Sequence, residues 1–292
     1  MVLDPKELSP VAVQQWMQGA VSPRPIAFAS TVDKDGKVNL SPFSFFNMFS
    51  ANPPMLIFSP ARRVRDNTTK HTLENVLEVP EVVINIVNYA MVEQMSLSSC
   101  EYDRGVNEFT KAGLTEAPSL TVRPPRVAEA PVSFECEVKD VIALGIEGGA
   151  GNLILCEVKK MHVQDSILNS EGRIDPYKLD AVARLGGDFY CRVQGDAIFE
   201  LPKPVANKGI GVDQIPAKIR ESKILTGNNL GRLGNIEQLP SEEETKEYLS
   251  KNLEWRELSK KKPSEADIHL FAQQLLEKKK VKEAWIALLS TL

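Results

Sequence analysis

Residues 41–54 carry side chains that could hold a flat organic ligand with a polar edge. Five small hydrogen-bonding residues are interleaved there with four aromatic rings: Ser41, Ser44, Asn47, Ser50 and Asn52 with Phe43, Phe45, Phe46 and Phe49. A ligand ring can pack against phenylalanines, while backbone groups and a side-chain amide satisfy its polar edge. Because prolines flank the stretch, we expect an ordered binding loop. The alternative is that the phenylalanines are ordinary core.

A second group of residues suits an anion. Three arginines precede a helix that we expect to begin near Asn67 or Thr68, and polar residues occupy its first turns: Arg62, Arg63, Arg65, Thr69, Lys70 and Thr72. A helix N-terminus offers unpaired N–H groups and about half a positive charge, which suits a phosphate. Ser59, at the end of the preceding strand, lies within reach of the same place. The alternative is that the arginines are solvated surface residues and Thr68 only caps the helix.

Composition excludes several classes of function. The 292 residues include 35 basic and 39 acidic side chains, and a net charge of −4 argues against nucleic acid as a partner. The chain starts without a secretory signal and contains no apolar run of about 20 residues, so we expect no membrane contact. Four separated cysteines predict a reduced, cytoplasmic protein. Three scattered histidines predict no metal site.

The order of predicted elements indicates a mainly β fold with added helices. Short apolar or alternating segments predict strands at 26–32, 37–41, 55–59, 82–87, 131–142, 153–163 and 189–199. Helices are expected at 9–20, 69–77 and 89–98, and further along at 241–251, 264–279 and 281–291. Strands this dense favour an antiparallel barrel over a doubly wound parallel sheet. The prolines at 201–204 place a boundary between a domain over 1–200 and a mostly helical extension over 201–292.

Several short motifs follow one another without interruption over about the first 195 residues. They are Ser22-Pro23-Arg24-Pro25-Ile26, Ser30-Thr31, the turn at 33–36, the run 39–47, Asn52-Pro53-Pro54, Glu108-Phe109 with 112–115, and Arg184-Leu185-Gly186-Gly187 before Tyr190. This pattern resembles the flavin reductase-like, FMN-binding split-barrel family and its flavoredoxin-type branch. The resemblance implies a six-stranded antiparallel split barrel, an FMN site shared across a homodimer, and electron exchange with NADH or NADPH.

The resemblance also implies where the cofactor binds. The isoalloxazine ring should contact Ser30, Thr31 and the backbone of residues 44–47, namely Ser44, Phe45, Phe46 and Asn47. Arg24 should reach the flavin O2 or the phosphate. The phosphate itself should lie among Ser59, Arg62, Arg63, Lys70 and Thr72, although the family's usual Lys-Asp-Thr run reads Lys70-His71-Thr72 here. No catalytic side chain is assigned, because the flavin accepts the hydride itself.

Three functions remain open at this stage. We expect an NAD(P)H:flavin oxidoreductase that passes electrons to free flavin, a partner protein or a small acceptor. The first alternative is a non-enzymatic FMN electron carrier, and the second is an interaction module whose barrel is empty. Cys100 could be a redox thiol, but it lacks a resolving partner and we expect it to be dispensable. We also expect a homodimer whose interface is formed mostly by the barrel, with the C-terminal helices packed on the barrel or beside it. The apolar stripe of Trp285, Leu288 and Leu289 must also be covered by some surface.

Overall fold

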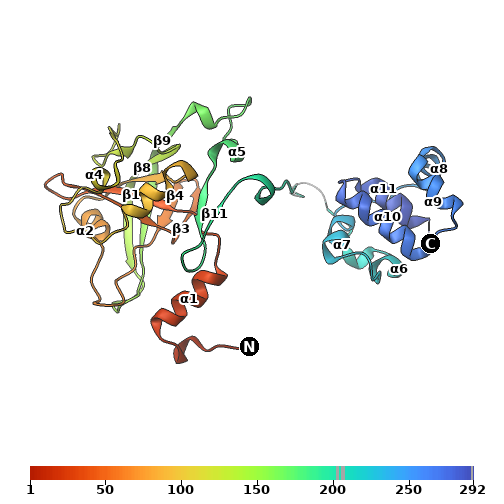
Figure 1. The fold of residues 1–292 in the computed structure, drawn as a ribbon, viewed down its shortest axis with the longest axis horizontal. Coiled ribbons are helices and arrows are strands. Elements are labelled where there is room, and N and C mark those ends of the chain that lie inside the picture. The colour runs from red at the N-terminus through yellow and green to blue at the C-terminus, as the bar shows by residue number, and fades with distance from the viewer. Residues whose placement is uncertain (202–203, 205–207, 291) are drawn as a thin grey trace. The chain divides into compact units, whose positions relative to one another are not determined.

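The computed structural model describes residues 1–201, 204, 208–290 and 292 (Figure 1). Backbone contacts divide the chain into two compact units, Met1–Phe199 and Glu200–Leu292. The segment 201–204, where the sequence places a boundary, includes residues 202 and 203, which lie outside the described residues. The two units are described separately below.

The first unit is built on a seven-stranded sheet whose neighbouring strands are all antiparallel, in the order β2-β1-β5-β8-β9-β4-β3. Its strands are β1 (Ala27–Val32), β2 (Val38–Phe43), β3 (Phe46–Ala51), β4 (Pro54–Phe58), β5 (Glu81–Ile86), β8 (Val132–Ala143) and β9 (Asn152–Val163). Two small sheets pair β6 (Glu116–Ala117) with β7 (Arg126–Val127), and β10 (Val182–Arg184) with β11 (Tyr190–Arg192). The edge strands β2 and β3 are joined by only two residues, so the sheet must curl until its edges approach each other. The predicted mainly β class is confirmed, with seven main strands where six were expected.

Strand β3 was missed by the sequence prediction of an ordered loop. Phe46 pairs with Phe58 of β4 and packs against the core, while Asn47 on the opposite face is exposed. This alternation is the ordinary two-residue period of a strand. Of the polar residues that suggested a loop, Asn47 and Ser50 lie on this edge strand, which carries a bulge between Met48 and Ser50, while Ser41 lies on β2, Ser44 between the two strands and Asn52 after β3. The predicted strand at 189–199 was also wrong beyond residue 192, since only β11 forms there.

The first unit also contains the helices α1 (Pro10–Ala20), α2 (His71–Glu78), α3 (Val92–Leu97), α4 (Glu108–Ala112) and α5 (Pro176–Leu179). Of these, α2, α3 and α4 contribute buried residues to the apolar clusters on the sheet. Strand β1 is buried along its whole length because Ala27 and Ala29 face one apolar cluster and Ile26 and Phe28 the other. Helix α1 begins as predicted, with Pro10 in its first turn and the Ser9 hydroxyl accepting from the Ala12 amide at 3.2 Å.

Helix α2 begins later than the sequence predicts. Its N-cap is Lys70, and Asn67 takes a left-handed conformation with φ of 57°. A residue with positive φ cannot continue a right-handed helix. Thr68 and Thr69 therefore belong to the preceding loop and do not cap the helix.

The second unit is helical and has a core of its own. Its helices are α6 (Ala217–Arg220), α7 (Gly227–Leu233), α8 (Glu242–Lys251), α9 (Leu253–Lys260), α10 (Glu265–Glu277) and α11 (Val281–Leu289). The indole of Trp285 is fully buried inside this unit and donates to the Leu233 carbonyl at 2.9 Å. Leu288 is buried beside it and Leu289 packs against the same cluster. The apolar stripe is thus covered within its own unit.

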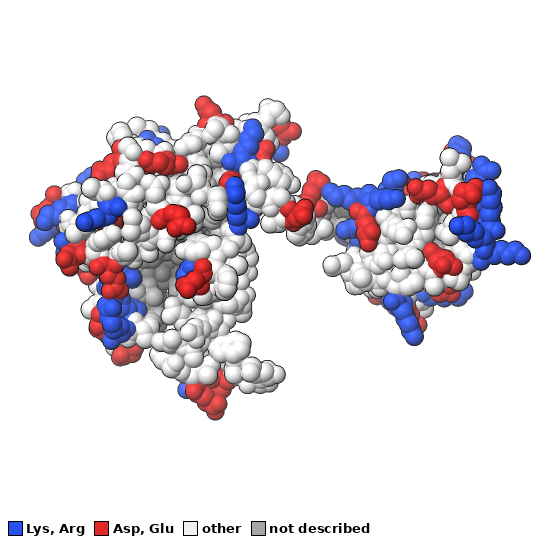
Figure 2. Space-filling model, viewed as in Figure 1, with Lys and Arg blue, Asp and Glu red and all other residues white. Residues whose placement is uncertain are grey.

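No helix in the described part of the chain is long and apolar enough to cross a membrane. On the visible face of the first unit, acidic and basic side chains are intermixed (Figure 2).

Candidate functional site

The first unit contains a pocket of about 710 Å³ between helix α1 and the loop at 61–70. One wall is apolar and comes largely from α1 and the residue after it, with Val13, Met17 and Val21. The opposite side carries the cationic residues of the loop. Of the twelve residues predicted from the sequence, five line this pocket: Arg24, Phe45, Arg62, Arg63 and Lys70.

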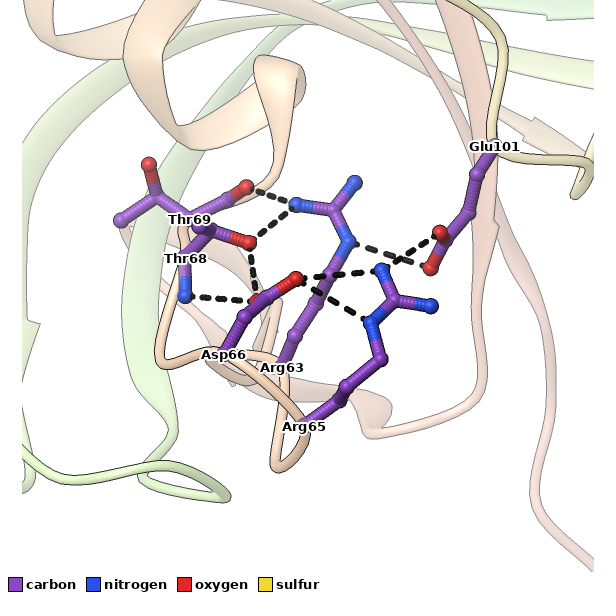
Figure 3. Close-up of polar contacts among 6 residues, drawn as sticks. All are labelled: Arg63, Arg65, Asp66, Thr68, Thr69 and Glu101. Atoms are coloured by element: carbon purple, nitrogen blue, oxygen red, sulfur yellow. Dashed lines mark hydrogen bonds and ion pairs between the residues drawn. The ribbon is translucent and has the colours of Figure 1, made fainter.

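Arg63 is held in place by the loop that carries it (Figure 3). Its Nη1 donates to the Thr68 hydroxyl at 2.9 Å and to the Thr69 carbonyl, while its Nε lies 3.1 Å from the Glu101 carboxylate. Glu101 also accepts from Arg65 at 2.9 Å. Hydrogen bonds from Arg65 and then Arg63 lower the pKa of Glu101, so this carboxylate stays ionised and ties both arginines together.

The turn itself is closed by Asp66, which faces the same network (Figure 3). The Thr68 hydroxyl donates to one carboxylate oxygen at 2.6 Å, and the Thr68 amide donates to the same atom at 3.1 Å. The hydroxyl bond is the largest of the effects that lower the pKa of Asp66 to about 2. The turn is therefore stabilised by a charged acceptor over the whole neutral range.

Arg62 is fixed by a second set of bonds and by a glycine-rich hairpin. Its Nε and Nη2 both donate to Asn67, at 2.6 Å each. Its backbone pairs with the turn between β8 and β9, where the Gly149 amide donates to the Arg62 carbonyl at 3.0 Å. A Cβ on Gly148 would lie 3.1 Å from the backbone of Arg63, and Gly149 has φ of 93°. The glycines thus let the hairpin approach the arginine loop closely.

Lys70 is the least compensated charge in the pocket. Its ammonium group makes no hydrogen bond or ion pair with any residue that the structure describes. Burial, and next the charge of Arg63, lower its pKa, and the charge of Glu101 opposes them only in part. A half-buried cation beside other cations gains free energy when an anion binds. The cationic side of the pocket therefore fits a phosphate.

Ser59 does not line this pocket, although the sequence predicted it there. Its hydroxyl is buried, and among the described residues it has no hydrogen-bond partner. The space next to it is narrow, since a Cβ on Gly151 would lie 2.7 Å from the Ser59 oxygen. Its amide donates to the Phe45 carbonyl at 2.9 Å, which fixes the backbone of a residue that lines the pocket.

Arg24 lines the pocket but its guanidinium is largely occupied. It donates to the carbonyls of Gln18, Val21 and Leu185, and its Nε lies 3.4 Å from the Ser44 hydroxyl oxygen. Burial and the nearby charge of Arg184 lower its pKa. In this arrangement Arg24 fastens the end of α1 to the barrel.

Six predicted residues lie outside the large pocket besides Ser59. The buried Thr31 and Thr72 hydroxyls accept from Asn75 and Asn39, at 3.1 and 2.9 Å. The remaining four are Ser30, buried in β1, Ser44, which lines a smaller pocket, and Phe46 and Asn47 on β3.

The α1 wall and the hairpin glycines were missed as site residues. The sequence showed that α1 has an apolar stripe. Only the structure shows that this stripe is incompletely buried and faces a cavity. Nothing local to Gly148 and Gly149 indicates their neighbour, because they meet the arginine loop only in the folded chain.

Comparisons with known proteins agree with this architecture. The profile of the flavin reductase like domain matches residues 19–177. A protein of Aquifex aeolicus is 38% identical over 191 residues, which cover 65% of this chain and 95% of that protein. Nitrilotriacetate monooxygenase component B from Bacillus cereus is 30% identical with a TM-score of 0.64, covering 69% of this chain and 98% of that one. A split barrel domain structure from Shewanella frigidimarina is 26% identical with a TM-score of 0.58, covering 70% and 99%.

The matched domain ends before the second unit, which begins at Glu200. The strands of the matched domain are those of the curled antiparallel sheet. Its loop at 61–70 forms the cationic side of the pocket. The chain belongs to the flavin reductase-like family, and its first unit has the split-barrel fold.

Proposed function

We propose that the first unit binds FMN in the pocket between α1 and the loop at 61–70 and acts as an NAD(P)H-dependent flavin reductase. The observation that carries the proposal is the Lys70 ammonium, which has no hydrogen-bond or ion-pair partner among the described residues and lines the pocket with Arg62, Arg63 and an apolar wall, in a member of this family. A volume of about 710 Å³ is in the range of cofactor pockets. Electrons would pass to free flavin, a partner protein or a small acceptor.

The residues have separate roles in this proposal. Arg62, Arg63 and Lys70 bind the phosphate, and the bonds to Asn67 and Thr68 orient the two arginines before the cofactor arrives. Phe45 and the α1 wall exclude water from the ring. Bound FMN supplies the hydride acceptor, so no side-chain acid or base is required.

Exposed apolar side chains of the first unit support a homodimer. Trp16 and Met17 on α1, and Met48 and Phe49 on β3, are each more than half exposed. Exposed apolar side chains on a helix and on an edge strand favour association with another surface. We propose that a second copy of the chain covers them, and light scattering of the FMN-loaded protein should give twice the monomer mass. A stable monomer at micromolar concentration with FMN bound would contradict this.

The central experiment is a visible spectrum of the purified protein, identification of the released cofactor, and anaerobic addition of NADH or NADPH. The proposal expects a flavin spectrum, FMN on release, and bleaching by one or both donors. A flavin that is bleached by dithionite but by neither donor would indicate an electron carrier. A colourless protein that does not take up added FMN would overturn the proposal and favour an interaction module.

A further inference from the structure

A second, smaller pocket adjoins the site where Arg24, which lines the large pocket, meets Ser44, which lines the small one. It has a volume of about 130 Å³ and is lined in part by Ser44, Arg184 and Tyr190. Arg24 lines the large pocket and Ser44 the small one, and the two side chains are 3.4 Å apart at Nε and Oγ. A group bound in the small pocket would therefore lie next to the proposed FMN site.

Arg184 presents an uncompensated charge to this pocket. It lies on β10, and its backbone exchanges two hydrogen bonds of 2.9 Å with Arg24. Its guanidinium carbon lies 4.5 Å from the centre of the Tyr190 ring. Across residues 1–201, 204, 208–290 and 292, no hydrogen bond or ion pair to the Arg184 side chain is found. The ring holds the guanidinium in place while its donors remain available.

The neighbouring Arg24 adds to the positive potential. Its guanidinium donates to three backbone carbonyls and lies near one hydroxyl, all uncharged, and the charge of Arg184 contributes to lowering its pKa. Two guanidinium groups are thus held close together without a carboxylate among their hydrogen-bond partners. Such an arrangement attracts an anion, and the planar fork of arginine suits phosphate or carboxylate oxygens.

Arg192 on the adjacent strand β11 provides an internal comparison. It also stacks on an aromatic ring, with its guanidinium carbon 3.9 Å from the centre of Tyr89. However, it forms two hydrogen bonds of 2.7 Å to the Asp180 carboxylate. The same small sheet therefore carries one neutralised arginine, at the surface, and one unneutralised arginine, in a pocket beside the proposed flavin site.

We propose that the small pocket binds a compact anionic group of the reactant that meets the flavin, and we assign that group to the diphosphate of the nicotinamide dinucleotide. The pocket is too small for a whole dinucleotide, so it anchors one group while the rest of the molecule lies outside. Arg184 and the Ser44 hydroxyl would contact the phosphates, and Tyr190 would position Arg184. The assignment rests on the proposed function, because it supplies the binding site for the electron donor.

The test compares Arg184→Ala and Arg184→Lys with the matched control Arg192→Ala, all in the full-length FMN-loaded protein. Anaerobic bleaching of FMN is followed against NADH and NADPH concentration at low and high salt. Binding of ADP-ribose, which has the diphosphate but no nicotinamide, is measured by calorimetry. Benzoate is titrated in the same way to test for a carboxylate ligand.

We expect Arg184→Ala to raise the donor concentration needed for half-maximal bleaching about ten- to a hundredfold and to weaken ADP-ribose similarly. Arg184→Lys should recover part of this loss, since it keeps the charge but not the fork. FMN affinity and the limiting bleaching rate should change little, and Arg192→Ala should resemble the wild type.

Three outcomes would overturn the inference. The first is that Arg184→Ala binds the donor and ADP-ribose as well as the wild type does, with FMN bound and reduced. This result would overturn the inference and leave the proposed function intact. Arg184-dependent binding of benzoate but not of ADP-ribose would reassign the pocket to a carboxylate substrate. Equal losses in Arg184→Ala and Arg192→Ala would show that both arginines act through the fold of the small sheet.

Discussion

Replacing Lys70 with methionine should change FMN binding and protein stability in opposite directions. The ammonium is half-buried and without a hydrogen-bond partner in the described residues, and burial and then Arg63 lower its pKa. In the apo protein the charged form is therefore a cost to folding. Methionine keeps most of the side-chain length and removes the charge. We expect the free energy of unfolding of the apo protein to rise.

The loss in FMN affinity follows from the same geometry. A charge-assisted hydrogen bond to phosphate contributes about 1.5–3 kcal/mol. Since about 1.4 kcal/mol corresponds to a tenfold change, Lys70→Met should weaken FMN about ten- to 150-fold. Riboflavin has the same ring without the phosphate, so its dissociation constant should hardly change. Salt should weaken FMN binding to the wild type more than to the variant.

The assay is a fluorescence titration of apo protein with FMN and with riboflavin, together with urea unfolding. The control is Lys111→Met, because Lys111 lies over the Tyr102 ring outside the pocket and should affect neither ligand. Equal losses for both flavins would mean that Lys70 acts on the ring site or the fold. An unchanged FMN affinity would place the phosphate elsewhere, and a destabilised apo protein would refute the electrostatic reasoning.

Other predictions concern residues outside the pocket. Thr72→Ala should lower stability by about 1 kcal/mol, through loss of the bond from Asn39, and affect FMN and riboflavin alike in titrations; a loss confined to FMN would return Thr72 to the phosphate site. Cys100→Ser should keep the flavin spectrum and donor oxidation, because this exposed thiol has no cysteine partner in the described residues; lost turnover with FMN bound would refute this. Burial alone would raise the pKa of Glu135, but hydrogen bonds, first from the Thr121 hydroxyl, lower it to about 2. Its stabilisation is therefore present above the unfolded value near 4.5 and is lost as pH falls toward 2, by up to about 3 kcal/mol; urea midpoints of Glu135→Gln should fall less over that range than those of the wild type.

The sequence by itself was enough to predict the kind of fold and one end of the site. Alternation along 132–138 and the short spacing between strands indicated an antiparallel barrel, because a strand's side chains alternate regardless of what it pairs with. The start of α1 at Ser9-Pro10 could also be predicted, because helix capping depends only on residues that are near in sequence. The basic residues Arg62, Arg63 and Lys70 stand within nine positions, so one loop brings them together.

Only the tertiary structure decided which predicted residues share a pocket. Thr72 is two positions from Lys70, yet its hydroxyl faces Asn39 in the barrel, because packing of α2 on the sheet fixes the rotation of the helix. Thr31 faces Asn75 because the register of β1 in the sheet fixes the face to which its side chain points.

The pocket also depends on segments far apart in the chain. Helix α1 supplies one wall, and the glycines at 148–149 support the loop at 61–70 from more than 75 residues away. Arg24 and Arg184 are brought side by side by a backbone pairing across 160 positions. Local patterns determine which face of an element is apolar, but a site made of several elements exists only after their packing fixes register and rotation.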